Sequence, residues 1–338
     1  MPFANTAGWP DEILGIVENS KTVEYASLTR AGVPITFPML LFIGEDGLTL
    51  DVSTALTFPA KAQRARNNPK VCLLFSDPLG CGLDSPPVVL VYGLATVRDA
   101  DLQANTDRFV NLVFQRFSDV YGQFPSILLK KMAWYFTRVW IQVTPLRILW
   151  WHGGDLSREP KTWQAPKSRQ VPPSDPPPTD KVLKRWDKPP TEWLTSAEHA
   201  VASLGKPVLT VVDSDGYPVP IRTQDASLEA DGFQLTLCQI PPAPAQGKAC
   251  LTFHQHDEKF ISWQENLVFV GEVSGDVKNA SFKVDRRLTS ISLKGSQLQI
   301  MLDLFKLGRR FAPRLKTEAR RRGQAVPAVR LPKEHKNR

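Results

Sequence analysis

The sequence lacks the motifs that assign many enzymes to a class at sight. None of its four cysteines stands in a C-x-x-C pair, and it has neither a G-x-S-x-G nor a P-loop pattern, so hydrolase and NTPase chemistry find no support. No run reaches the roughly 18 apolar residues that a membrane helix needs. Met1 is not followed by the charged and apolar segments of a secretory signal. We therefore expect a soluble, cytoplasmic protein.

Net charge is also nearly absent from most of the chain. The formal net charge is +8, but residues 309–338 contain eleven Lys or Arg and only two Glu. Residues 295–322 have helical spacing with apolar and basic positions, and such a helix can bind an anionic membrane surface or, nonspecifically, nucleic acid. The alternative, which we favour, is a helix docked on the folded body. Its end, from Gly323 onward, is predicted to be unstructured.

The spacing of apolar residues and turns predicts a mainly β fold with flanking helices. A chain of 338 residues with 42% hydrophobic residues suits about two domains. Short strand-like segments divided by turns fill most of the first 100 residues, which is the pattern of an antiparallel barrel. Helices are expected at 101–116 and 126–136, followed by a strong strand at Arg138–Trp151. Cys72 and Cys250 lie in apolar runs, where buried free thiols are expected.

A proline-rich segment divides the chain. Five of the seven residues at 172–178 are proline, and proline cannot continue a helix or a central strand because it lacks the amide donor and fixes φ. We interpret this segment as part of an extended, semi-rigid linker. The predicted organisation is a barrel at 1–153, the linker at 154–190, a second barrel at 191–280 and a basic helical extension at 281–338.

The second half repeats the first in outline. Lys70–Phe75 (KVCLLF) matches Lys248–Phe253 (KACLTF), and in both halves the cysteine stands 21 residues before a glycine in the next strand. Two turns match in the same order, so duplication is a better explanation than the chance sharing of generic turns. These turns are Gly32-Val33-Pro34 with Gly216-Tyr217-Pro218, and Asp46-Gly47-Leu48 with Asp231-Gly232-Phe233.

The halves differ in a polar segment around Lys61. The glycine of the Asp-Gly turn precedes the cysteine by 25 residues in the first half and by 18 in the second. In the longer version Lys61 and Arg64 share a helical face, and the hydroxyls of Ser53 and Thr54 precede them at a strand end. Such groups donate hydrogen bonds to a phosphate. Taken alone, the segment is explained more simply as a charged, solvated surface helix.

The order of these motifs resembles that of the flavin-binding split-barrel family, which includes pyridoxamine 5′-phosphate oxidase-like proteins and flavin- and deazaflavin-dependent reductases. The resemblance covers residues 9–151 well and 191–277 more weakly, and many family members have an arginine where this chain has Pro59. The matching motifs are Gly32-Val33-Pro34, Asp46-Gly47, Ser53-Thr54, Lys61, Asn68-Pro69-Lys70-Val71 and Val91-Tyr92-Gly93-Leu94-Ala95-Thr96-Val97.

This resemblance implies two tandem antiparallel split β-barrels and a dependence on FMN or, alternatively, a deazaflavin. It implies an oxidoreductase that acts on a small organic substrate, with the flavin performing the redox step. In the family two barrels pack together around the cofactor, so a homodimer or a pair within one chain is expected. The implied cofactor-binding residues are Ser53, Thr54 and Lys61 at the phosphate with Arg64 or Arg66 assisting, and Thr36, Phe37 and Pro38 along the ring.

Several alternatives remain at this stage. The protein could be a noncatalytic flavin- or haem-binding protein, or an adaptor that acts through its basic tail. The segment Leu149–His152 could cover a cofactor ring, although packing within the barrel is the more common role of such a strand. His254 and His256 should lie on one face of a strand, but no third ligand is evident nearby, so we expect no metal there.

Overall fold

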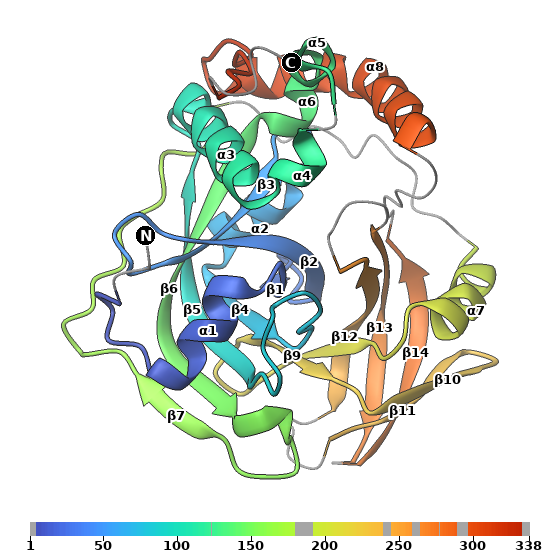
Figure 1. The fold of residues 1–338 in the computed structure, drawn as a ribbon. Helices are drawn as coiled ribbons and strands as arrows, with labels where there is room; N and C mark the ends of the chain where they lie inside the picture. Colours follow the sequence, from blue (N-terminus) through green and yellow to red (C-terminus); the bar gives the residue numbers. More distant parts are fainter. Residues whose placement is uncertain are drawn as a thin grey trace.

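The two halves of the chain form two antiparallel β-sheets that lie side by side (Figure 1). Helices flank both sheets, so the predicted mainly β fold with two tandem barrel-like units is confirmed. The structure is a computed structural model, and it describes residues 5–122, 124–179, 192–238, 245–258, 264–276, 278–288 and 297–332.

Six strands of the first half close into a barrel. Their order is β3-β2-β1-β4-β5-β6, and β6 pairs back onto β3. The ten-residue strand β2 makes closure possible, because its beginning pairs with β1 and its end with β3. A seventh strand extends the far end of β6. The strands are β1 (Thr22–Leu28), β2 (Pro34–Ile43), β3 (Leu50–Ala55), β4 (Lys70–Phe75), β5 (Val88–Arg98), β6 (Arg138–Trp151) and β7 (Lys161–Gln164).

The second half follows the same strand order but stays open. Its sheet runs β9-β8-β12-β13-β14-β11-β10, so β9 and β10 together take the place of β2. They are separated by Thr223 and Gln224 and do not pair with each other. The strands are β8 (Val208–Val212), β9 (Pro218–Arg222), β10 (Asp225–Glu229), β11 (Gly232–Thr236), β12 (Gln246–His256), β13 (Gln264–Gly275) and β14 (Asn279–Arg287).

A glycine at the same place in each half explains the equal intervals in the sequence. The register of β5 against β6 shifts between Tyr92 and Gly93, and that of β13 against β14 shifts between Val270 and Gly271. A Cβ on Gly93 would lie 2.5 Å from a methyl carbon of Val143, and one on Gly271 would lie 1.8 Å from a backbone oxygen of the facing strand. Glycine is therefore required at each bulge because the neighbouring strand approaches too closely for a side chain.

The two halves contact each other through the outer face of the first barrel. Lys70, the first residue of β4, donates a hydrogen bond to the carbonyl of Asp215 in the turn before β9. Lys248 at the equivalent place in β12 donates to the carbonyl of Ala31, before β2, at 3.0 Å. This reciprocity shows that the halves are related by an approximate twofold arrangement. Residues of the first half such as Cys72 and Tyr92 also join the hydrophobic core of the second.

The helices lie mainly around the first barrel (Figure 1). The helix predicted at 126–136 is divided at Met132, and no helix in the described parts of the chain is long and apolar enough to cross a membrane. All four cysteines are buried free thiols, which confirms that expectation for Cys72 and Cys250. The helices are α1 (Asp11–Asn19), α2 (Ala60–Asn67), α3 (Leu102–Arg116), α4 (Ser118–Tyr121), α5 (Ser126–Lys131), α6 (Ala133–Phe136), η1 (His152–Gly154), α7 (Leu194–Ser203) and α8 (Gln297–Arg321).

The proline-rich segment and the tail are more closely attached to the barrel than the sequence suggests. The linker region contains β7, and the amide of Asp175 donates to the carbonyl of Val97 on β5 at 2.9 Å; residues 180–191 lie outside the described chain. Contrary to the prediction, residues 323–332 are not unstructured; residues 333–338 lie outside the described chain. Val329 and Leu331 are buried against the first barrel, because hydrophobic side chains spaced two apart bury one face of an extended segment.

Candidate functional site

The helix α2 carries the cationic residues of the predicted site. It lies between β3 and β4, contacts β1, β5 and β6, and is held by the buried side chains of Ala62 and Ala65. Its end is set by Asn68, whose extended backbone precedes Pro69. The predicted helix around Lys61 is therefore present, and its buried alanines turn Lys61 and Arg64 toward the protein rather than toward solvent alone.

Lys61 lies over an aromatic ring without an anionic partner. Its Nζ is 4.3 Å from the centroid of the Phe37 ring, a favourable cation–π arrangement. Burial, together with the nearby charges of Arg64 and Arg138, lowers the pKa of Lys61 to about 7. Within the described residues the ammonium group forms no ion pair or hydrogen bond. The site thus holds a half-buried lysine whose charged form is partly desolvated and has no counter-ion among the described residues.

Arg64 extends from the same helix into the space between the halves. Its Nε donates to Ser27 Oγ at 2.9 Å, whereas one terminal nitrogen, Nη2, is buried without any hydrogen-bond partner. Burial lowers the pKa of this guanidinium, while Tyr25 and Cys250 act in the opposite direction. Cys250 belongs to β12, so the second half reaches this side of the site. A buried donor without a partner is costly, which marks Arg64 as a position that a ligand would satisfy.

Arg138 is a third cation that the sequence analysis did not include. It is the first residue of β6, opposite Ala55 of β3, and its guanidinium lies 4.0 Å from the centroid of the Phe109 ring and 4.5 Å from that of Tyr135. Its Nε is buried without a hydrogen-bond partner. A charged residue at the start of a strand was the available signal, but only the pairing of β6 with β3 places it near Lys61.

The two predicted hydroxyl residues have different environments. Thr54 Oγ1 donates to the carbonyl of Phe58 at 2.8 Å, which stabilises the turn between β3 and α2 and accommodates the spacing from Thr54 to Lys61. Ser53 is buried and pairs across the sheet with Trp140. Its hydroxyl forms no hydrogen bond with the described residues. Thr54 therefore shapes the approach to the helix, and Ser53 keeps a donor available.

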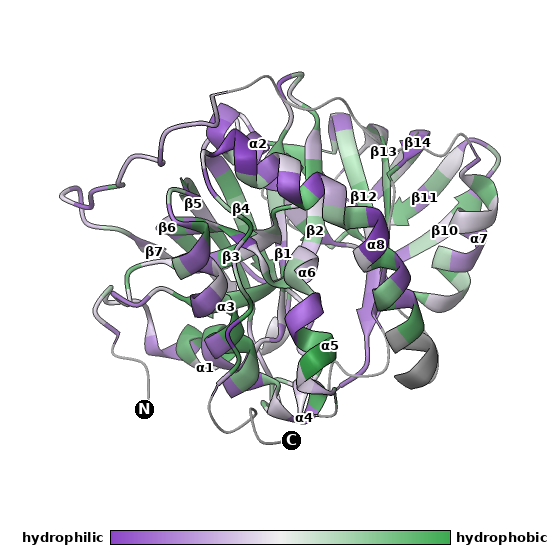
Figure 2. Ribbon diagram, turned by 90° about the horizontal axis from the view of Figure 1, so that it is seen from above, coloured by the Kyte–Doolittle hydropathy of each residue, from purple (hydrophilic) through white to green (hydrophobic). Residues whose placement is uncertain are grey.

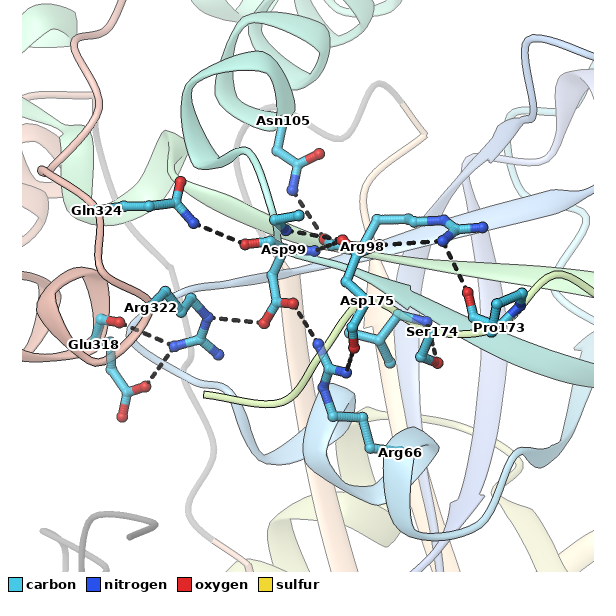
Figure 3. Close-up of polar contacts among 12 residues, drawn as sticks. Arg66, Arg98, Asp99, Asn105, Pro173, Ser174, Asp175, Glu318, Arg322 and Gln324 are labelled. Carbon is cyan, nitrogen blue, oxygen red and sulfur yellow. Dashed lines mark hydrogen bonds and ion pairs between the residues drawn. The ribbon is translucent and has the colours of Figure 1, made fainter. Parts of the chain in front are cut away.

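Arg66 points into a separate ionic network (Figure 3). Its guanidinium pairs with Asp99 at the end of β5 and donates to the carbonyl of Asp175. Asp99 also accepts a hydrogen bond from Arg322 Nε at 2.8 Å, and Arg322 pairs with Glu318 of α8 at 2.8 Å. The network fixes α2 to the linker and to the C-terminal segment. In this arrangement Arg66 positions the helix, and its assistance at a phosphate stays a prediction.

The three residues predicted along the ring lie on β2, between α2 and the second half. Phe37 is the ring under Lys61. Thr36 faces the other way: its hydroxyl is 2.6 Å from that of Thr210 on β8, and its carbonyl accepts from Thr252 Oγ1 at 3.1 Å. Pro38, which is half-buried, pairs with Glu24 of β1. Strand β2 thus connects the candidate site directly to the second half.

A buried polar network lies at the same interface. The guanidinium of Arg222 pairs with Glu24, and His254 Nε2 is 3.0 Å from the same carboxylate. Burial opposes ionisation of Glu24, but Arg222 and His254 together hold its pKa below the usual value. Asp77 contacts both His254 and His256, at 3.8 and 3.4 Å, as expected for imidazoles on one face of β12. The described residues contain no group suited to a metal ion.

The tryptophans at the end of β6 take structural roles. Trp150 belongs to the core of the first barrel and donates to Glu12 at 2.8 Å. Trp151 joins the core of the second half and donates to the carbonyl of Arg158 at 3.0 Å. Both rings are buried, so they pack between elements, which is the more common role considered for this strand.

Comparisons with known proteins give likenesses of fold over less than half of the chain. No family model and no curated protein matches. The chain is similar to a putative pyridoxamine 5′-phosphate oxidase from Listeria innocua, with 24% identity over 41% of this chain and 94% of the other, at a TM-score of 0.29. An F420 reductase shows 21% identity over 41% and 98% of the two chains, at a TM-score of 0.32. The haem storage protein HutZ from Vibrio cholerae shows 15% identity over 46% and 92%, at a TM-score of 0.27.

Proposed function

We propose that the first half binds the phosphate of FMN or of a deazaflavin, and that the protein is an oxidoreductase acting on a small organic substrate. One observation carries the proposal: Lys61, Arg64 and Arg138 are desolvated cations near one another, and none pairs with a carboxylate among the described residues. Buried charges without partners are strongly unfavourable. A phosphate dianion would balance these charges and satisfy the buried Nη2 of Arg64.

The residues around the cations fit the remainder of such a cofactor. The free hydroxyl of Ser53 supplies a further donor, and Phe37 with its strand β2 offers an apolar wall for a planar ring. The second half, through Thr210, Thr252 and Cys250, lies against the opposite face of that strand. When bound, the flavin supplies the redox chemistry; the protein binds it, orients it and excludes water.

The direct test is the affinity for FMN compared with riboflavin, which has the same ring system without phosphate. We expect the protein to prefer FMN, and Lys61→Ala and Arg64→Ala to reduce that preference by roughly 10- to 100-fold each, the value of a charge-assisted hydrogen bond. Flavin fluorescence quenching measures both ligands. Arg30→Ala provides a matched control, because Arg30 is exposed in the turn before β2.

Three outcomes separate the alternatives. Equal affinity for FMN and riboflavin, unchanged in the Lys61 variant, would contradict the phosphate site. Tight FMN binding without turnover of reduced nicotinamide and an electron acceptor would support the noncatalytic flavin-binding alternative. A deazaflavin that binds in place of FMN and loses affinity in the same variants would retain the site and change only the cofactor.

A further inference from the structure

Exposed apolar side chains gather where α5 meets α8. Of the large hydrophobic residues that are exposed in the described chain, Ile127 of α5 is the most exposed at 73%, and Leu302 and Phe305 of α8 follow at 50% and 45%. The two helices adjoin, since Leu128 and Phe305 line the same open cavity of about 180 Å³. Exposed aliphatic and aromatic side chains that cluster in this way mark an interaction surface.

Both helices also carry exposed cations near these apolar residues in sequence. Lys130 and Lys131 end α5, and Lys306 and Arg309 lie on α8 between and beside the exposed apolar residues. Arg309 lies over the Phe305 ring at 5.2 Å. Asp303 is the one carboxylate in the described side chains of this part of α8, and it pairs with Lys306 at 3.6 Å. The surface is therefore both apolar and strongly positive.

The opposite face of α8 is anchored to the first barrel. The Phe311 ring packs at a tilt against Trp134 and edge-on against Phe58, with centroids 5.3 and 4.9 Å apart, and Leu315 and Ala319 are buried in the same core. A Cβ on Gly308 would lie 3.0 Å from the Trp134 ring nitrogen, so the helix approaches α6 closely. This anchoring prevents Leu302 and Phe305 from rotating into the protein.

We propose that α5 and the N-terminal part of α8 dock on the surface of an anionic lipid membrane. Such a membrane accepts aliphatic side chains at the acyl boundary and attracts lysine and arginine through its headgroups. A nucleic acid would satisfy the cations through its phosphates but would leave Ile127 and Leu302 in water. The alternation of polar and apolar turns along α8, beside the apolar turn of α5, is visible in Figure 2.

Cosedimentation of the full chain with lipid vesicles tests this proposal. We expect binding to phosphatidylcholine vesicles that contain about one-third phosphatidylserine, weak binding to phosphatidylcholine alone, and loss of binding as salt is raised. Replacing Ile127 and Phe305 together by serine should weaken binding about tenfold. Lys130→Glu with Arg309→Glu should weaken it about tenfold or more, because each change replaces a cation that the headgroups attract by an anion that they repel.

Matched controls come from the second half. Leu194, 42% exposed on α7, and the exposed Lys206 allow Leu194→Ser and Lys206→Glu to be compared on the same vesicles, and both should bind like the original protein. Absence of vesicle binding, or equal binding of the Ile127 and Phe305 double variant, would overturn the proposal. So would binding of a duplex oligonucleotide, without vesicle binding, that depends on Lys130 and Arg309 alone.

Discussion

The first half of the molecule is a closed barrel with a cationic helix, and the second is an open sheet whose described residues include no such helix between β11 and β12. Strand β2 runs unbroken for ten residues in the first half, whereas its counterpart is divided at Thr223 and Gln224. The interval that holds α2 in the first half is seven residues shorter in the second. Both losses fall where the candidate site would be repeated, while the glycine bulge and the interface lysines persist in both halves.

This contrast separates what folding needs from what binding needs. The bulge glycines and the buried strands are kept twice because each sheet needs them to pair. Lys61, Arg64 and Arg138 occur once, and they are unfavourable for the fold, since burial lowers the pKa of each. An unfavourable feature that is present in one half only is consistent with the binding site proposed above.

The largest expected effect comes from disconnecting α2 from the rest of the first half. Asp99→Asn removes the carboxylate shared by Arg66 and Arg322, whose side chains are 9% and 7% exposed. Leaving two buried guanidinium groups without this partner should reduce the free energy of unfolding by about 3 kcal/mol. Urea denaturation followed by circular dichroism measures it. Arg330→Ala, at a pair whose arginine is 67% exposed, should cost at most about 1 kcal/mol; an equal loss in both variants would contradict the role of Asp99.

A pair of substitutions tests whether the glycine bulge is equally important for the stability of the two halves. Gly93→Ala and Gly271→Ala both place a methyl group against the facing strand, and each should cost about 2 kcal/mol or more through overpacking. Thermal unfolding of the two variants gives the comparison. Gly15→Ala, within α1, is the control. The added Cβ would lie 3.5 Å from the side chain of Leu83, an ordinary contact distance, and alanine should stabilise the helix slightly because its helix propensity is higher than that of glycine. Tolerance at one bulge alone would break the equivalence.

The smallest expected effect is an increase in the stability of the folded chain. Lys61→Met removes a group whose pKa is about 7 in the folded chain, well below its unfolded value, so the unfolded chain binds more protons between pH 7 and about 10.5. The destabilisation of the folded chain by charged Lys61 is complete below pH 7 and disappears toward pH 10.5. The cofactor-free variant should therefore be more stable than the original by about 1 kcal/mol or more at pH 7. Denaturation at pH 6.5 and 10 checks this; a pH-independent difference would contradict a buried lysine.

Local patterns predicted those features that depend on neighbours in sequence. The cysteine-to-glycine interval indicated the duplicated strands, and Asn68-Pro69 indicated the end of α2, because each reflects the geometry of one strand or one turn. The seven-residue difference falls in the interval that holds α2 in the first half, whereas residues 239–244 of the second half's interval lie outside the described chain. Strand Arg138–Trp151 was predicted with the bounds that β6 has.

The features that local patterns did not predict depend on contacts between residues that are distant in sequence. Arg66 was assigned with Arg64 because both lie on one short helix, but its partner Asp99 is 33 residues away, and Asp99's second partner, Arg322, is 223 residues further on. Arg138 was overlooked because only strand pairing brings it to Lys61. The tail after Gly323 is polar enough to suggest disorder, yet Val329 and Leu331 find a hydrophobic surface that no local pattern reveals.

The reciprocal lysine contacts have a genetic consequence. In a symmetric dimer of separate chains every substitution appears at both sites, so neither copy can change alone. Here the halves that exchange Lys70 and Lys248 belong to one polypeptide, and their association is independent of protein concentration. Each half can therefore change by substitution without the same change appearing in the other half.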